Sequence, residues 1–294
     1  MKKSVCSGGR TRNGFAVGVV SSVVLLASAG SVLGQYAVEV KRYESGTGFA
    51  TEFGTGAGYT TPASILGEPS RVTPGLFGGP VDPFSAPYLI EQVLSVGTVG
   101  VVEVRLDTPV RRDALNPYGI DFLVFGAAGF VITNGDYSGG GITDGSLYRG
   151  GQAEARVSVS TDGLQYFTLD GSLSPILDAM FPTDGAGDFT VPVDPSLTPA
   201  SFSGLGYTGI RAAYGGSGGG AGFSLAWARD GVGSPVVLDS VGYVRIEVLS
   251  GQVLLDGVST VRPVPEASTW VLLGIGSLAL VGWTRRGGFR SSQR

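Results

Sequence analysis

The sequence predicts an all-β protein whose body is an antiparallel, jelly-roll-like β-sandwich. Segments of strand length recur along the chain with apolar and polar side chains in alternation, which is the pattern of a strand with one buried face. Gly, Asp and Pro separate these segments, and Gly alone accounts for 50 of the 294 residues. Short strands between such turn residues are typical of sandwiches and barrels.

The first clear strands lie in the middle of the chain. In residues 102–106, Val and Leu alternate with Glu103 and Arg105, so this strand should have one wet face. Residues 120–125 are apolar on both faces apart from Asp121, as expected of a central strand. Residues 153–160 alternate again, and after a turn they are followed by a partner strand at 165–169, which together predict a hairpin.

The end of the body repeats this pattern. Residues 244–248 alternate, a turn follows at 250–251, and the last strand is expected over 252–261. The one predicted helix begins at Ser174, with Pro175 in its first turn, and ends before Pro182.

The two ends of the chain are predicted to be targeting segments. Residues 1–34 have a basic start followed by an apolar run, the organisation of a secretory signal peptide. Cleavage fits after Ala29 or after Gly34, and the later site is preferred because strand-like residues begin directly after it. Residues 263–294 contain an apolar segment at 269–284, expected to be a short transmembrane helix with the following arginines on the cytoplasmic side.

The C-terminal segment resembles the PEP-CTERM sorting signal of Gram-negative bacteria. The resemblance rests on three parts in order: Val264-Pro265-Glu266, the apolar segment, and Arg285-Arg286. It implies recognition by an exosortase-type sorting enzyme and a link to exopolysaccharide, while the predicted signal peptide implies delivery through the secretion translocon. Ala267 stands where the motif usually has a second Pro, which bears on the efficiency of processing.

The body, residues 35–262, has resemblances of its own. Residues 155–163 and 242–246 resemble strands of the galactose-binding-like jelly roll found in discoidin-type domains. Residues 66–69, 116–122 and 124–126 resemble an uncharacterised body found on other PEP-CTERM surface proteins. These resemblances imply a jelly-roll-like fold. They do not imply a ligand, because proteins that share a fold often bind different ligands.

Composition excludes several kinds of chemistry. The chain has no His, and Cys6 is its only Cys, so His-dependent nucleophile systems and thiolate zinc sites cannot be built from it. The segment between the two basic ends carries 12 basic and 24 acidic residues. Because phosphate binding requires clustered Lys and Arg, nucleic acid is not expected as a partner.

Two Gly-rich loops carry side-chain oxygens that could coordinate calcium. The preferred interpretation is that the same side chains form turns. Apart from this possible calcium ion, no cofactor is expected. The candidate calcium residues are Asn134, Asp136 and Asp144 in one loop, and Asp184, Asp188 and Asp194 in the other.

We therefore expect that the protein is not an enzyme. We expect an exported protein of the cell surface or extracellular matrix, with a structural or adhesive role and contact with glycan. Loop aromatics could stack on sugar rings, although core packing is expected for most of them; they are Tyr59, Phe84, Tyr88, Tyr137, Tyr148 and Tyr214. The alternative is a glycan-processing enzyme that uses paired carboxylates, for which the candidates are Glu103, Asp107, Asp121 and Glu154. Alternation places Glu103 and Glu154 on wet faces.

Overall fold

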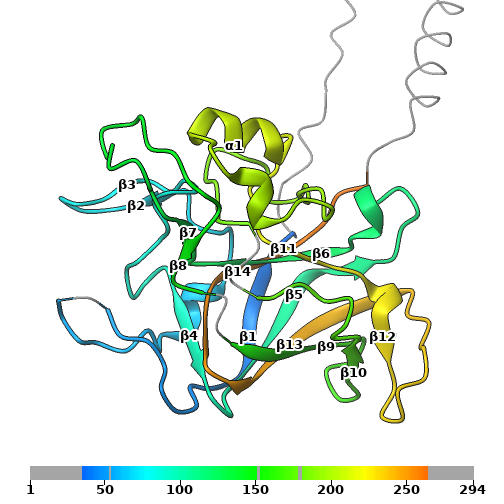
Figure 1. Cartoon of the computed structure of the whole chain (residues 1–294). Coiled ribbons are helices and arrows are strands. Elements are labelled where there is room, and N and C mark those ends of the chain that lie inside the picture. Colours follow the sequence, from blue (N-terminus) through cyan, green and yellow to red (C-terminus); the bar gives the residue numbers. More distant parts are fainter. Residues whose placement is uncertain (1–34, 53, 151–152, 178–180, 264–294) are drawn as a thin grey trace, which may run out of the picture. The chain divides into compact units, whose positions relative to one another are not determined.

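The computed structural model describes residues 35–52, 54–150, 153–177 and 181–263, all of which fall within one compact unit. Two antiparallel sheets dominate it (Figure 1). The larger sheet has six strands in the order β1-β5-β13-β9-β10-β12. Its strands are β1 Ala37–Glu44, β5 Val101–Arg111, β9 Glu154–Ser160, β10 Phe167–Leu169, β12 Ala228–Arg229 and β13 Ser240–Ser250.

The smaller sheet has four strands in the order β11-β6-β14-β4. These strands are β4 Leu94–Gly97, β6 Phe122–Gly126, β11 Ala221–Phe223 and β14 Gln252–Thr260. Two further two-stranded pairs are β2 Val72–Thr73 with β3 Gly79–Pro80, and β7 Gly129–Phe130 with β8 Leu147–Tyr148. The described helices are η1 Pro62–Ile65, η2 Pro117–Gly119, η3 Pro199–Phe202, α1 Tyr207–Tyr214 and η4 Leu225–Trp227.

The inner faces of the two sheets share one hydrophobic core. It includes Val104 of β5 and Val244 of β13 from the larger sheet, and Phe122 of β6 and Val258 of β14 from the smaller one. Burial of such side chains from both sheets is the main force that holds a sandwich together. The prediction of an all-β, antiparallel fold is confirmed, and the arrangement is consistent with a jelly-roll-like body.

The chain passes between the sheets at a sharp corner after β13. Ser250 ends β13 in one sheet and Gln252 begins β14 in the other, so Gly251 alone makes the connection. Its φ of 76° lies in the left-handed region, which Gly adopts without steric penalty. The predicted turn and last strand are therefore confirmed, and they connect the two layers.

The predicted helix at Ser174 is wrong for the residues that the structure describes. Residues 174–177 form no helix, and residues 178–180 lie outside the described residues. The Ser174 hydroxyl and amide both donate to the carbonyl of Asp170, so this side chain closes a turn and does not cap a helix. The helix α1 occurs later in the chain, where Gly215 ends it in the left-handed conformation.

A second, smaller core lies under α1. Ile210 and Tyr214 project from one face of the helix into a cluster that contains Phe130, Phe181 and Phe202. Phe202 and Tyr214 meet edge to face, with ring centroids 5.8 Å apart. The described residues between β10 and β11 thus pack their aromatic side chains together with Phe130 of β7 in a core separate from that of the two sheets.

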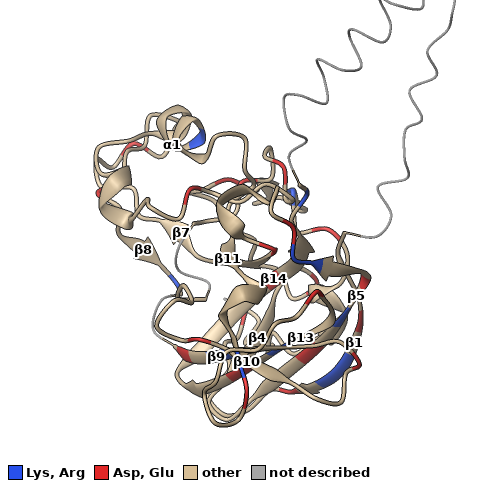
Figure 2. Cartoon of the chain, turned by 90° about the vertical axis from the view of Figure 1, so that its right-hand side faces the viewer, with Lys and Arg blue, Asp and Glu red and all other residues tan. Residues whose placement is uncertain are grey.

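Glu103 of β5 is buried, although the sequence predicted that it would face solvent. Only 7% of this residue is exposed, because Arg245 of β13 and Arg42 of β1 cover it from either side. Arg245 donates to Glu103 at 2.9–3.0 Å and stacks on the Tyr166 ring at 3.6 Å. Tyr166 also donates to Glu103 through its hydroxyl. Figure 2 shows basic and acidic positions close together on β1 and β13.

The predicted signal peptide at 1–34 and the apolar segment at 269–284, predicted to be a transmembrane helix, lie outside the described residues. Within the part of the chain that the structure describes, no helix is long and apolar enough to cross a membrane.

Glu103 should matter for stability although it lies on the outer face of a sheet. We expect Glu103→Gln to lower the free energy of unfolding by about 2 kcal/mol, because it leaves the partly buried guanidinium of Arg245 without its countercharge. The matched change Glu154→Gln, at an exposed position on β9, should cost less than about 0.5 kcal/mol. Denaturant unfolding of the full chain in mild detergent measures both, and equal effects would contradict the assignment.

Asp256 gives the body a pH-dependent stability. It lies at a register shift in β14, is 2% exposed, and accepts hydrogen bonds from the amide and hydroxyl of Ser70. Burial raises the pKa of Asp256 from 3.8 to about 7. Between these two values the folded chain retains a proton that the unfolded chain has lost.

Stability contributed by this group should therefore fall as pH rises from about 4 to about 7, by at most about 1.4 kcal/mol per pH unit. We expect Asp256→Asn to flatten the dependence of Tm on pH in this window. Asp107→Asn, at an exposed position of β5, should leave the slope as it is in the unaltered chain. A slope unchanged in Asp256→Asn would refute the role of Asp256.

Candidate functional site

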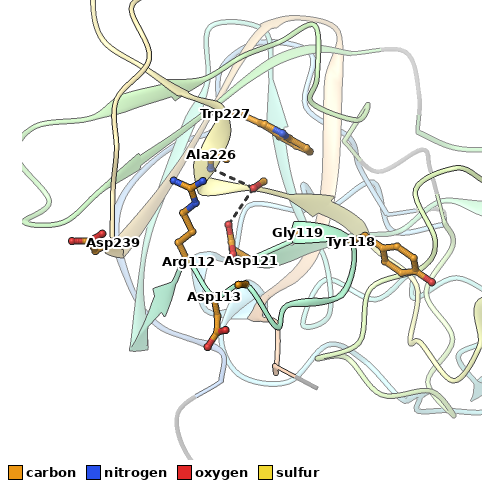
Figure 3. Close-up of a pocket in the computed structure, with 10 residues that line it drawn as sticks. Arg112, Asp113, Tyr118, Gly119, Asp121, Ala226, Trp227 and Asp239 are labelled. Carbon is orange, nitrogen blue, oxygen red and sulfur yellow. Dashed lines mark hydrogen bonds between the residues drawn. The ribbon is translucent and has the colours of Figure 1, made fainter. Parts of the chain in front are cut away.

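The candidate site is a pocket beside η4, here called the Trp227 pocket, with a volume of about 470 Å³ (Figure 3). This volume lies in the range of small-molecule pockets. Its charged and aromatic lining side chains are Arg112, Asp113, Tyr118, Asp121, Trp227 and Asp239. They lie directly after β5, in the η2 turn, directly before β6, in η4, and directly before β13.

The floor of the pocket is held by the carboxylate of Asp121. It accepts hydrogen bonds from the Asn116 side-chain amide at 2.7 Å, the Leu225 amide at 2.7 Å and the Ser224 hydroxyl at 3.2 Å. Ser224 in turn accepts from the Ala226 amide, so the two hydrogen bonds drawn in Figure 3 fix the start of η4. All of these partners donate to Asp121, which gives it a structural role.

Burial raises the pKa of Asp121, although its hydrogen bonds act in the opposite direction. The cost of burying this carboxylate is offset by three donors, and the result is a fixed junction of three chain segments. The lone polar residue of the predicted central strand is thus the residue that shapes the pocket.

Trp227 forms an aromatic wall of the pocket. Its ring packs edge to face against Phe223, with the centroids 6.5 Å apart, and the residue remains partly exposed. Tyr118 lies at the rim with 58% of its surface exposed and a φ of 57°, in the left-handed region that a non-Gly residue rarely adopts. The following Gly119 also has a positive φ, so the η2 turn is tightly bent.

Charged groups stand at the mouth of the pocket. The backbone amide of Arg112 donates to the carbonyl of Asp239 at 3.1 Å, which holds the end of β5 beside the start of β13. In the described part of the chain, the Arg112 guanidinium takes part in no ion pair or hydrogen bond. Asp113 accepts from the Leu115 amide in its own turn. The pocket therefore offers an aromatic face, a cationic donor and carboxylate acceptors.

A second region brings together four of the six loop aromatics that the sequence pointed to. Two adjacent pockets, of about 320 and 180 Å³, share Asp82 and Ser85, and together they are here called the Asp82 groove. Tyr88 and Tyr148 line one pocket, and Phe84 and Tyr137 line the other. The remaining two aromatics, Tyr59 and Tyr214, are each 2% exposed and belong to the core. Core packing had been expected for most of the six, and the structure shows full burial for these two.

The acidic loop residues close turns. Asp136 accepts from the amide of Ser138, Asp144 from that of Ser146, Asp188 from that of Thr190 and Asp194 from that of Ser196. Asn134 accepts from the amides of Asp136 and Ile142. Asp184 is 1% exposed and pairs with Arg211 of α1 at 3.0 Å. No group of three or more acids, Cys or His that could hold a metal occurs among the described residues. Calcium binding stays a prediction.

The four candidate carboxylates lie in different settings. Asp121 is in the floor of the Trp227 pocket and Glu103 is within the ion-pair cluster of the larger sheet. Asp107 and Glu154 are exposed on β5 and β9. No pattern in the sequence pointed to Arg112 and Trp227, because their juxtaposition depends on the pairing of β5 with β13 and on the fold of the segment before η4.

Comparison with known proteins identifies the C-terminal segment. A family model for the PEP-CTERM protein-sorting motif matches residues 263–286, a range that includes Val264-Pro265-Glu266 and Arg285-Arg286. These residues lie beyond the described part of the chain, apart from Pro263. A search of curated proteins finds no match to this chain. The chain carries a PEP-CTERM protein-sorting motif, which supports its assignment as an exosortase substrate.

Proposed function

We propose that this protein is anchored in the membrane by residues 269–284 until an exosortase-type enzyme processes it, and that it then has a structural or adhesive role at the cell surface or in the extracellular matrix. The sorting motif at 263–286 is the observation that supports export and sorting of the protein. The body would then work outside the cell, where polysaccharide is the abundant polymer to contact.

The Trp227 pocket supports contact with glycan. A sugar ring has an apolar face that stacks on an aromatic ring, and hydroxyl groups that require both donors and acceptors. Trp227 supplies the aromatic ring, Arg112 the donor, and Asp113 and Asp239 the acceptors. Because Phe223 and the hydrogen bonds of Ser224 fix η4, little side-chain entropy should be lost on binding.

The sorting proposal predicts a change in the size and location of the protein. A C-terminal fragment should be lost in cells that contain the exosortase, whereas cells without it should retain the longer form in the membrane fraction. Glu266→Ala should give the same longer form in cells that contain the enzyme, because it alters the matched motif. Glu91→Ala, at an exposed position in the body, should be processed normally. Immunoblots of cell fractions that show one size and location throughout would refute the proposal.

The glycan proposal predicts that binding depends on two side chains of the pocket. The full chain in mild detergent should bind members of a glycan array, and then the exopolysaccharide purified from the producing cells. We expect Arg112→Ala and Trp227→Ala to weaken binding by about tenfold, equal to about 1.4 kcal/mol. Trp227→Phe should retain part of the affinity because a flat ring remains.

Arg111→Ala is the matched control for Arg112→Ala, because Arg111 is exposed, adjacent in sequence and outside the pocket lining. It should bind as the unaltered chain does. Glycan contact at this pocket would be refuted if the array gave no binding, or if the Arg111 and Arg112 variants lost affinity equally.

A further inference from the structure

The Asp82 groove has a different chemistry from the Trp227 pocket. Asp82 lines both of its pockets, and Asp136 lines the smaller one. No Lys or Arg is among the described residues that line either pocket. The groove therefore combines carboxylates with aromatic rings, and its described lining supplies no cationic side chain to pair with those carboxylates.

Neither carboxylate has a cationic partner within the described residues. Asp82 accepts from the Phe84 amide at 2.8 Å, and Asp136 accepts from Ser138, but neither forms an ion pair. The nearby guanidinium of Arg211 is committed to Asp184 at 3.0 Å. Burial, with a smaller contribution from the charge of Asp184, raises the pKa of Asp82. A bound cation would relieve this unfavourable environment of the charged carboxylate.

Exposed aromatic rings flank the carboxylates. Tyr137 is 80% exposed, on a loop that Asn134 pins by donating to the Gly140 carbonyl and accepting from the Ile142 amide. Phe77 is 88% exposed, at the tip of the β2–β3 hairpin that borders the larger pocket. Exposed rings beside carboxylates can stack on a sugar and attract a cation to their faces.

We propose that the Asp82 groove binds an amino polysaccharide through its free ammonium groups. The carboxylates of Asp82 and Asp136 would pair with the ammonium groups, and the exposed rings would cover the sugar faces. A lysine-rich peptide shares the charge but has no flat ring face for Tyr137 and Phe77 to cover. The excess of acidic over basic residues in the body adds a long-range attraction for a cationic polymer.

The proposal concerns a different site from the Trp227 pocket and does not depend on it. The test is calorimetric titration of the full chain in mild detergent with a glucosamine hexamer that has free amines. The fully N-acetylated hexamer and hexalysine are the comparison ligands. We expect the free-amine hexamer to bind at least tenfold more tightly than either of them.

Variants locate the binding in the groove. Asp82→Asn keeps an acceptor for the Phe84 amide but removes the charge, and Tyr137→Ala alters an exposed ring, so both should fold. Each should weaken binding of the free-amine hexamer at least fivefold. Asp107→Asn removes the same charge from an exposed position of β5 outside the groove and should have no effect, as should Trp227→Phe.

Four results would overturn the proposal. Equal affinity for the acetylated and free-amine hexamers would show that the ammonium groups are not recognised. Equal affinity for hexalysine would assign the groove to a basic peptide. An equal loss in Asp82→Asn and Asp107→Asn would show attraction to the overall charge of the body rather than to a site. Loss of binding in Trp227→Phe alone would assign it to the Trp227 pocket instead.

Discussion

The buried carboxylate of Asp121 is the constraint on which the Trp227 pocket depends. A carboxylate in this position is tolerated only when its oxygens are supplied with donors, and the chain supplies them from the η2 turn and from the start of η4. These two segments are therefore held against the first residues of β6. The bend of the η2 turn and the position of the Trp227 ring follow from one requirement, that a polar group among apolar strands be satisfied.

Carboxylates have a second use in the loops, where each closes a local turn. Several Asp side chains accept from the amide two residues later, as Asp136 does from Ser138 and Asp194 from Ser196. A Gly-rich chain would otherwise lose much conformational entropy when its loops become ordered. Acidic turn residues limit the conformations available locally, and this allows loops to hold aromatic side chains in exposed positions without a large core beneath them.

The sequence was informative where structure follows from local periodicity. The strands at 102–106, 120–125 and 244–248 could be predicted because side-chain alternation has a fixed relation to a sheet face. The burial of Glu103 could not, because it depends on Arg42 and Arg245, which reach it from two neighbouring strands. Helix α1 was missed although Gly215 and the pair Ile210 and Tyr214 are helix signals. The Trp227 pocket required the order of strands, which periodicity does not encode.

The larger sheet also ends in two unlike edges, and both discourage the addition of further strands. One edge is β12, of only two residues. The other is β1, which has register shifts against β5 and carries Glu39, Lys41, Arg42 and Glu44. Short, irregular or charged edges are poor templates for edge-to-edge polymerisation. Even at high local concentration, such a body should resist conversion into cross-β fibrils of its own.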